Sequence, residues 1–485
     1  MFKRRSIGLF LCFLAIIAIC TLASSNAAAV VASKNTATTT KAKRTATRSS
    51  TRSLALVAVP TSIALSAAPT SVWLKTNSTL SGSLNTPDAS TGSANPVANE
   101  PIQIQVSTNS TSWTVVKTVT TAANGGFTTP VAITNASAEY RAVFTGDSNY
   151  AASQSATIRV TGFVASTRLV STGPTKVKAE TLTTFSGHYE VNDSRMNSHP
   201  AISGARVDVY RRDAYGAGWT LATTAVSNTS GNIAWRAKVS TPTYWKLVGH
   251  ATSTSHGSGS GEYLPHVVPI GTIYKLPAAA PKPIYLTPQP AAVGTGANPT
   301  VTAIPDRVWN DMTGKSWHAG CPVGRSQLLY MRVNYWGFDG YRHRGELVFR
   351  ASQRAKYVSA FTRIYNNHVP LHGMYRVDKF GYSSVTHGGD DYASMRHDNT
   401  SAFNCRWVDG NPGTLSPHAY GTAVDINPYE NPYHSAKGWT PNFWWRNHNF
   451  PPYTWRSRSA LLVRAMLNAG FHWTYGNEDS QHFDT

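Results

Sequence analysis

The sequence predicts a multidomain protein in which two all-β sandwiches are followed by an α+β domain. Apolar and polar residues alternate with period two in two separate stretches, and Gly- and Asn-containing turns interrupt both. A segment rich in proline and alanine follows. Residues 306–485 then become rich in aromatics, histidine and arginine and show helical periodicity.

Length and charge limit the functions to consider. At 485 residues the chain is too long for one core and indicates about three domains of roughly 150 residues. Its formal net charge of +20 favours polyanionic partners, such as anionic cell-wall polymers. No zinc-finger, helix-turn-helix or RNA-binding pattern accompanies this charge. Nucleic-acid binding therefore rests on charge alone, and we do not expect it.

Residues 1–29 are typical of an export signal. A basic start, Lys3-Arg4-Arg5, precedes the apolar run Ile7 to Leu22, and small residues extend to Ala29. The run is short for a spanning helix, which needs about 20 apolar residues. We therefore expect cleavage and a secreted chain, associated with the cell wall and without a stable membrane span.

A flexible basic spacer is predicted at 30–53, where Thr, Ser and Ala are mixed with Lys and Arg without apolar periodicity. The stretches 54–161 and 162–275 then repeat each other at an offset of about 105 residues. Their matched features are an alternating strand, a tryptophan, a glycine turn and an aromatic strand: Ile104, Trp113, Gly125 and Tyr140, then Val209, Trp219, Gly231 and Tyr244. Both stretches resemble bacterial immunoglobulin-like repeats.

Prolines in residues 276–305 predict a semi-stiff extended linker that holds the last domain away from the sandwiches. In the domain at 306–485, apolar residues recur at three- and four-residue steps from Leu347 to Tyr365, which predicts a helix. A second helix is predicted from Ser457 to Asn468. Phe471-His472-Trp473 is expected to form a strand. Four tryptophans are expected to form one aromatic cluster: Trp439, Trp444, Trp445 and Trp455.

Cysteine usage agrees with export. Cys12 and Cys20 leave with the signal, so the mature chain keeps Cys321 and Cys405. Two cysteines in one domain of an exported protein favour a disulfide. We do not expect them to bind a metal, because neither has a second cysteine at CxxC-like spacing.

The segment Ser416 to Asn427 contains two candidate metal ligands. Val424 and Ile426 flank Asp425 as in a strand, which directs the carboxylate away from its apolar neighbours. His418 lies seven residues earlier, across a turn that Gly421 permits. A surface histidine and a solvated carboxylate would fit this segment equally well.

Residues near the end of the sequence favour the metal site over these alternatives. His482 supplies the third ligand that a catalytic zinc ion needs, with one position left for water. Asp479 lies three residues earlier, where it could accept a proton from that water and pass it to a departing amine. Ser416 is expected to orient its loop, since no Gly-x-Ser-x-Gly elbow makes it a nucleophile.

The pattern Ser-x-His-(x)6-Asp, followed far downstream by Asp-x-x-His-Phe, resembles the zinc peptidases of the D-alanyl-D-alanine carboxypeptidase family. This family includes VanY-type carboxypeptidases and L-alanyl-D-glutamate endopeptidases. The resemblance covers about residues 325 to 485 and includes the motifs Asp390-Asp391 and Asn399 to Arg406.

The resemblance implies one zinc ion held by His418, Asp425 and His482, with Asp479 as the acid/base carboxylate. It also implies an arginine that binds the scissile carbonyl oxygen as charge develops. Arg406 is the first choice and Arg396 the second, although the family's usual Gly-Tyr-Arg-Ser context is absent. An arginine paired with Asp390, Asp391 or Asp409 fits the sequence equally well.

The implied substrate is the stem peptide of bacterial peptidoglycan, cut at a terminal D-Ala-D-Ala bond or an internal L-Ala-D-Glu bond. The sequence does not choose between these bonds. A second hypothesis is a wall-anchored adhesin whose last domain is a retired peptidase. The complete set of ligands and the carboxylate oppose it, and the zinc content of the protein would separate the two.

Overall fold

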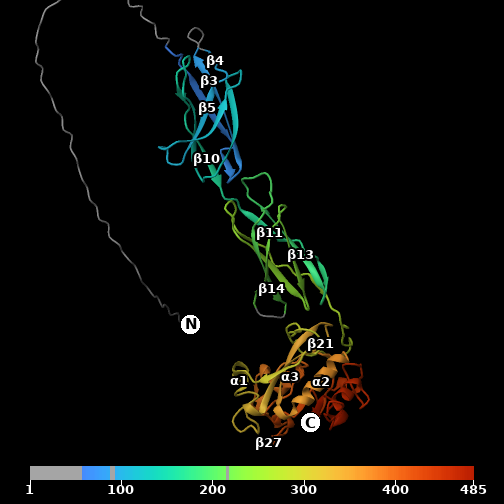
Figure 1. Ribbon diagram of the computed structural model, residues 1–485. Coiled ribbons are helices and arrows are strands. Elements are labelled where there is room, and N and C mark those ends of the chain that lie inside the picture. Colours follow the sequence, from blue (N-terminus) through green and yellow to red (C-terminus); the bar gives the residue numbers. More distant parts are fainter. Residues whose placement is uncertain (1–56, 88–92, 215–217) are drawn as a thin grey trace, which may run out of the picture. The chain divides into compact units, whose positions relative to one another are not determined.

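The computed structural model describes residues 57–87, 93–214 and 218–485 (Figure 1). The predicted export signal at 1–29 and basic spacer at 30–53 lie outside the described residues. Within the described ranges, no helix is both long enough and apolar enough to cross a bilayer. The described chain is rich in β-structure and contains several hydrophobic cores.

Two sheets form the first sandwich, and their strands are antiparallel except for the parallel pair β2·β10. One sheet has the order β1-β3-β4, with β7 also paired to β3, and the other has the order β2-β10-β8-β5-β6, with β9 paired to β8. The strands are β1 Ser62–Ala68, β2 Ser71–Trp73, β3 Asn77–Pro87, β4 Ala94–Pro96, β5 Pro101–Ser107, β6 Thr114–Thr120, β7 Gly126–Ala132, β8 Ala138–Phe144, β9 Ser153–Gln154 and β10 Ile158–Phe163. Alternate residues of facing strands, including Leu80, Ile104 and Phe144, fill the core between the sheets.

The second sandwich has a similar topology, without a counterpart of β4 among its described strands. Its sheets have the orders β11-β13-β16 and β15-β14-β17-β18, and a parallel pair β12·β19 corresponds to β2·β10. The strands are β11 Thr167–Ser171, β12 Lys176–Lys178, β13 Leu182–Val191, β14 Arg206–Asp213, β15 Thr220–Val226, β16 Asn232–Lys238, β17 Thr243–Gly249, β18 Ser258–Gly259 and β19 His266–Val268. The matched sheets agree with the repeat seen in the sequence.

The two turn glycines of the repeat have the same structural requirement. Gly125 and Gly231 both have positive φ, at 72° and 74°. A Cβ on Gly125 would lie 2.5 Å from the Leu84 carbonyl oxygen, and one on Gly231 would lie 2.4 Å from that of Tyr189. Only glycine fits both the left-handed backbone and this close approach.

The residues that follow the sandwiches form a domain built on the sheet β20-β21-β22, with β23 parallel to β21. These strands are β20 Thr300–Ala303, β21 Leu328–Gly337, β22 Arg342–Arg350 and β23 Pro370–Leu371. The helices are α1 Asp306–Met312, α2 Arg354–Asn366, α3 Asp391–Arg396 and α4 Leu461–Leu467. Four two-stranded ribbons complete it: β24 Tyr382–Ser383 with β25 Gly388–Gly389, β26 Trp407–Val408 with β27 Asn411–Leu415, β28 Ala423–Asp425 with β31 His482–Asp484, and β29 Tyr433–Ser435 with β30 Gly438–Thr440.

The predicted helix from Leu347 to Tyr365 is correct only in its second part. Residues up to Arg350 belong to β22, and α2 begins at Arg354. β22 is buried on both faces, so its apolar residues Leu347, Val348 and Phe349 are consecutive and have no period-two signal. The second predicted helix ends as expected but begins only at Leu461. The expected strand at 471–473 is reduced to a single bridge between His472 and Asp484.

Residues 276–305 differ from the expected free linker, because they pack against the domain that follows them. Ala280 and Ala297 are buried in its hydrophobic clusters. Gln289 is buried as well, and its amide exchanges hydrogen bonds with the backbone of Met374 at 2.8 and 3.0 Å. Prolines remove backbone donors, but they do not prevent side-chain packing.

The core of the second sandwich supplies a stability test. Trp245 is fully buried, with its ring centroid 4.9 Å from that of Phe185 and 5.7 Å from that of Trp235. Trp245→Ala should lower the free energy of unfolding by about 3–5 kcal/mol through lost burial and a residual cavity. Val226→Ala, at a side chain 63% exposed, should change it by less than about 0.5 kcal/mol. Calorimetric unfolding of the full chain checks both predictions. Equal changes in the free energy of unfolding for the two variants would contradict the burial of Trp245 in this core.

Candidate metal centre

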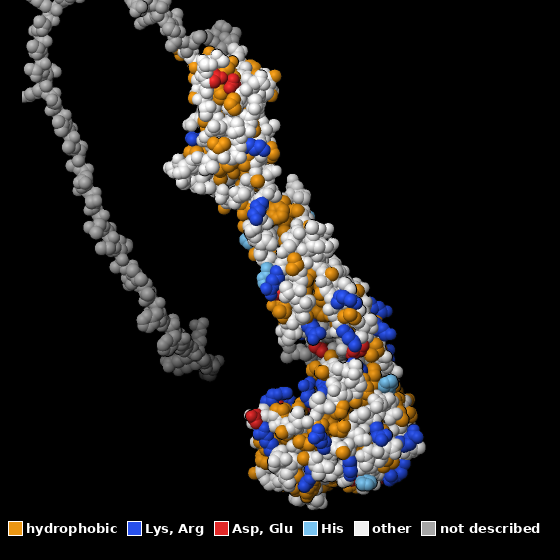
Figure 2. All heavy atoms as spheres, viewed as in Figure 1, with side chains coloured by type: hydrophobic (Ala, Val, Ile, Leu, Met, Phe, Trp, Pro, Cys, Tyr) orange, Lys and Arg blue, Asp and Glu red, His pale blue; other side chains and the backbone are white. Residues whose placement is uncertain are grey.

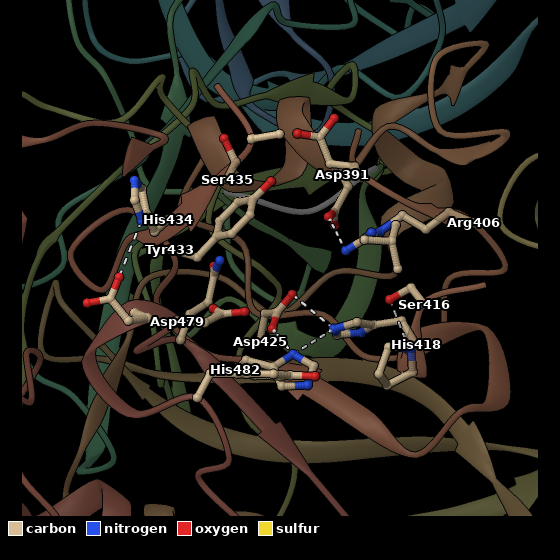
Figure 3. A pocket seen from close by; sticks show the side chains of 17 residues that line it. Asp391, Arg406, Ser416, His418, Asp425, Tyr433, His434, Ser435, Asp479 and His482 are labelled. Atoms are coloured by element: carbon tan, nitrogen blue, oxygen red, sulfur yellow. Dashed lines mark hydrogen bonds and ion pairs between the residues drawn. The ribbon is translucent and has the colours of Figure 1, made fainter. Parts of the chain in front are cut away.

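The three predicted ligands meet in the last domain. Asp425 ends β28 and His482 begins β31, and these residues lie opposite each other in the antiparallel register. His482 Nδ1 is 3.1 Å from Asp425 Oδ1, and His418 Nε2 is 3.2 Å from Asp425 Oδ2 (Figure 3). One nitrogen or oxygen of each residue lies within 4.8 Å of the others, and all three side chains are buried.

Short-range structure places His418. The residue lies in a 3-10 turn, Pro417–Tyr420, whose N-cap Ser416 accepts a hydrogen bond from the His418 backbone N–H. Gly421 ends the turn at φ 69°, and a Cβ there would lie 2.7 Å from the Arg350 nitrogen. Both the expected role of Ser416 and the need for glycine at 421 agree with this geometry.

The core under the ribbon holds Asp425 in place. Val424 and Ile426 point into the main hydrophobic cluster, so the carboxylate between them faces the opposite side. Tyr357 on α2 donates a hydrogen bond of 2.9 Å to the Ala423 carbonyl, while its ring stacks on Phe349. The helix therefore fixes the strand that carries the ligand.

A hydrogen bond also fixes the His418 ring. Nδ1 lies 2.6 Å from the Ala402 carbonyl oxygen, so Nδ1–H donates to it and the Nε2 lone pair faces Asp425 and His482. Such an outer contact orients histidines that ligate metals. Two imidazoles and one carboxylate, arranged in this way, suit a zinc ion with one open position.

The pKa values of the two carboxylates of the site, Asp425 and Asp479, are shifted in opposite directions. Burial raises the pKa of Asp425, but the imidazoles of His418 and His482 outweigh burial and hold that pKa well below its usual range. Burial and then the charge of Asp425 raise the pKa of Asp479 to about 7, although the two imidazoles and Arg406 act to lower it. Asp479 Oδ1 is buried without a hydrogen-bond partner. A carboxyl group with a pKa near neutrality can both accept and donate a proton.

The ligands and Asp479 line a cavity of about 320 Å³. Arg406 also lines this cavity, whereas Arg396, the second choice from the sequence, does not. Arg406 Nη2 pairs with Asp391 Oδ2 at 2.7 Å, so one of the pairings considered from the sequence is present within reach of the cavity (Figure 3). Its Nε is buried without a partner.

Sequence reasoning missed the opposite wall of the cavity. Tyr433, His434 and Ser435 on β29 line it, and the His434 ring stacks on Trp439 with centroids 4.9 Å apart. Burial and then Tyr392 raise the pKa of Tyr433 well above its usual range, so its hydroxyl stays protonated. The alternation Tyr-x-Ser in a Pro-rich loop was the available signal, but three residues are too few to identify a strand.

The predicted tryptophan cluster is divided. Trp445 packs with Trp444 and Tyr453 in one small core, whereas Trp455 is buried in the main cluster. Trp439 stands apart, on the ribbon beside the cavity. Aromatic composition indicated packing, but it could not assign each ring to its core.

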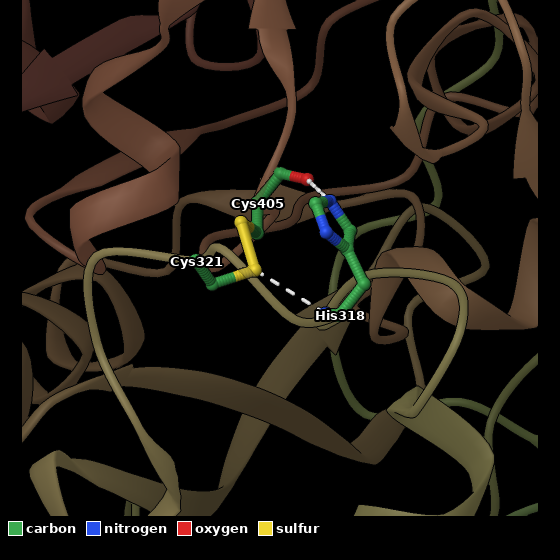
Figure 4. Close-up of side chains that lie close together, drawn as sticks. All are labelled: His318, Cys321 and Cys405. Carbon is green, nitrogen blue, oxygen red and sulfur yellow. Dashed lines mark hydrogen bonds between the residues drawn. A yellow bond between two sulfur atoms is a disulfide. The ribbon is translucent and has the colours of Figure 1, made fainter.

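A disulfide joins Cys321 to Cys405, the residue before Arg406 (Figure 4). The Cys405 N–H donates to the Ser316 carbonyl at 2.8 Å, and His318 Nε2 lies 3.2 Å from the Cys405 carbonyl oxygen. Although His318 lies beside both cysteines, the sulfur atoms are bonded to each other and unsuited to a metal. This bond anchors the segment from which Arg406 extends.

Residues 409–485 match the family model described as D-alanyl-D-alanine carboxypeptidase. This range contains the three clustered ligands and Asp479, while Arg406 lies just before it. The match supports a peptidase domain at this end of the sequence. No curated protein matches the chain.

Solved structures resemble the chain only weakly. Invasin, a bacterial integrin-binding protein, is 11% identical over 58% of this chain and 48% of its own, with a TM-score of 0.28. The D0-D1 domain of intimin is 12% identical, covering 42% and 97%, with a TM-score of 0.16. The human OSCAR ligand-binding domain is 10% identical, covering 42% and 97%, with a TM-score of 0.18. These scores are too low to indicate fold or function.

The Cys321–Cys405 pairing can be tested in the full-length protein. Without reductant, alkylation should label neither Cys321 nor Cys405, and mass spectrometry reads this directly. Replacing both with serine should lower the free energy of unfolding of this domain by about 2–5 kcal/mol, because the bond closes a long loop at a sequence separation of 84. Labelling of both thiols in the untreated protein would contradict the pairing.

Proposed function

We propose that this protein is a secreted, zinc-dependent peptidase that hydrolyses peptide bonds in the stem peptides of bacterial peptidoglycan. The meeting of His418, Asp425 and His482 beside Asp479 in one cavity carries the proposal. The match to the D-alanyl-D-alanine carboxypeptidase family model supports the substrate class. The bond is the terminal D-Ala-D-Ala bond or the internal L-Ala-D-Glu bond.

In this proposal each residue has a separate chemical role. A zinc ion held by the three ligands supplies Lewis acidity toward the scissile carbonyl and the attacking water. The Asp479 carboxylate accepts a proton from the water and returns it to the departing amine, a task that suits its pKa of about 7. Arg406 donates N–H groups to the carbonyl oxygen as negative charge develops, while Asp391 holds its guanidinium in position.

The charge of the surface suits an exported wall protein. Figure 2 shows Lys and Arg side chains spread over the visible face of the last domain and the second sandwich, with few acidic ones. Such a surface attracts anionic wall polymers without sequence-specific recognition. The sandwiches would then serve as spacers or binding modules, because all proposed catalytic residues belong to the last domain.

Digestion of purified peptidoglycan with the full chain tests the proposal. Mass spectrometry of the fragments should show loss of a terminal D-alanine or separation of the stem peptide from its first alanine. Addition of a chelator should abolish this release, and zinc should restore it. A protein that holds stoichiometric zinc but releases nothing would contradict the function. A protein that holds no zinc would favour the adhesin hypothesis.

Substitutions separate metal binding from proton transfer. His418→Ala and His482→Ala should each lose bound zinc and activity together. Asp479→Ala should retain zinc but lower kcat by about 10²- to 10⁴-fold, because proton transfer is lost. His472→Ala, at a side chain 70% exposed, is the matched control and should retain both. Zinc analysis and peptide hydrolysis provide the readouts, and full activity of Asp479→Ala would remove that residue from the mechanism.

Zinc affinity should depend on pH through His482. Burial lowers the pKa of this imidazole, but the hydrogen bond and charge of Asp425 raise it more, to about 9. A protonated imidazole cannot ligate a metal, so below pH 9 zinc binding must expel the proton. The apparent affinity should therefore fall about tenfold for each unit of pH below 9 through this group alone. Calorimetry in buffers of different ionisation enthalpy should detect about one released proton per zinc at pH 7, and none would contradict the assignment.

A further inference from the structure

The tip of the β26–β27 hairpin places an unsatisfied carboxylate in the wall of the catalytic cavity. Asp409 lines the same cavity as His418 and Asp425, and its side chain is only 8% exposed. Neither carboxylate oxygen makes a hydrogen bond of full geometry, and the neighbouring donor that interacts with it is the Tyr392 hydroxyl. A buried carboxylate with so few donors is costly, so it indicates a further partner.

The cation nearest to Asp409 does not satisfy it. Lys437 Nζ lies 3.8 Å from Asp409 Oδ1, beyond hydrogen-bonding distance, and the lysine side chain is 65% exposed. An exposed pair at this separation contributes little and is readily replaced. The two hairpin tips nevertheless meet closely, because a Cβ on Gly410 would lie 2.8 Å from the Ala436 Cβ. Asp409 is therefore held in place beside the cavity.

A second unsatisfied group lies beside it. The Tyr392 hydroxyl is buried and makes no hydrogen bond of full geometry. Burial and then hydrogen bonding toward Asp409 raise its pKa to about 12, so the hydroxyl lies close to that carboxylate. The Tyr392 ring already lies 5.5 Å from Lys437 Nζ, so its aromatic face is positioned toward a cation. A carboxylate, a hydroxyl and an aromatic face together suit a primary ammonium group.

Asp391, another acid that lines the cavity, is already engaged. Asp391 pairs with Arg406 at 2.7 Å and is not free to bind a second cation. Arg406 in turn excludes another cation from its own part of the cavity. Asp479 also lines the cavity with one oxygen that has no partner, but it is already assigned to proton transfer. Among the described cavity-lining groups outside the proposed catalytic set, Asp409 thus offers a buried negative charge whose hydrogen-bonding capacity is largely unused.

We propose that Asp409, with Tyr392, forms a subsite for the side-chain ammonium of a diamino-acid residue in the substrate peptide. This inference rests on the proposed function and adds to it which stem peptides the enzyme selects. The ammonium would displace Lys437 and donate hydrogen bonds to the carboxylate. A peptide without the charge would leave the buried carboxylate unpaired, so it would be a poorer substrate.

Two forms of one synthetic peptide test the subsite. The peptide spans the bond cleaved in the peptidoglycan digestion and carries a diamino acid whose side-chain amine is either free or acetylated. The full-length protein should cleave the free-amine form with a kcat/KM about 10- to 100-fold higher. In Asp409→Asn, which preserves shape but removes the charge, this ratio should fall to about 1. Lys437→Ala is the matched control and should keep or increase the preference.

The outcomes distinguish this inference from the proposed function. Equal cleavage of both peptides by the unmodified protein would overturn the amine subsite and leave the peptidase intact. Failure to cleave either peptide or peptidoglycan, despite bound zinc, would overturn the proposed function itself. A ratio that stays high in Asp409→Asn, with unchanged zinc content and thermal unfolding, would assign the selectivity to another residue and contradict the role of Asp409.

Discussion

The antiparallel pairing of two three-residue strands is the constraint on which the candidate site depends. The register sets Asp425 opposite His482, and directly opposed residues of such a ribbon bring their side chains within a few ångströms of each other. A slip of one residue would turn one ligand to the other face of the ribbon. The buried residues Val424 and Phe483, paired in the same ribbon, oppose such a slip because they would have to leave the core.

The sequence predicted the residues of the site better than the surroundings that support them. Histidine and aspartate at a distinctive spacing are visible without coordinates, and alternation around Asp425 predicted its strand. The pairing of Arg406 with Asp391 was one of several alternatives, because a side-chain partner depends on tertiary contacts. The proposed Asp409 subsite could not be predicted from the sequence for the same reason, because this loop carboxylate becomes buried only when the two hairpin tips meet.

Secondary structure was predictable where periodicity was intact. The strands of both sandwiches face solvent on one side and alternate clearly, so the repeat could be recognised from Ile104 and Val209. Each of these positions lies at the corresponding bulge of its strand pair, which confirms that the match extends to local geometry. In the last domain, β22 is covered on both faces and its apolar run was mistaken for the start of a helix. The high proline content also led to the prediction of a free linker at 276–305, whereas these residues pack against the last domain.

Two long loops are closed in the last domain, one by the Cys321–Cys405 bond and one by the contact of Asp425 with His482. They occupy successive parts of the sequence, so neither loop encloses the other. Thiol oxidation and binding of the proposed zinc ion would therefore not require a fixed order. If the proposed zinc ion binds, an oxidised chain without metal and a metal-bound chain with free thiols are both topologically accessible.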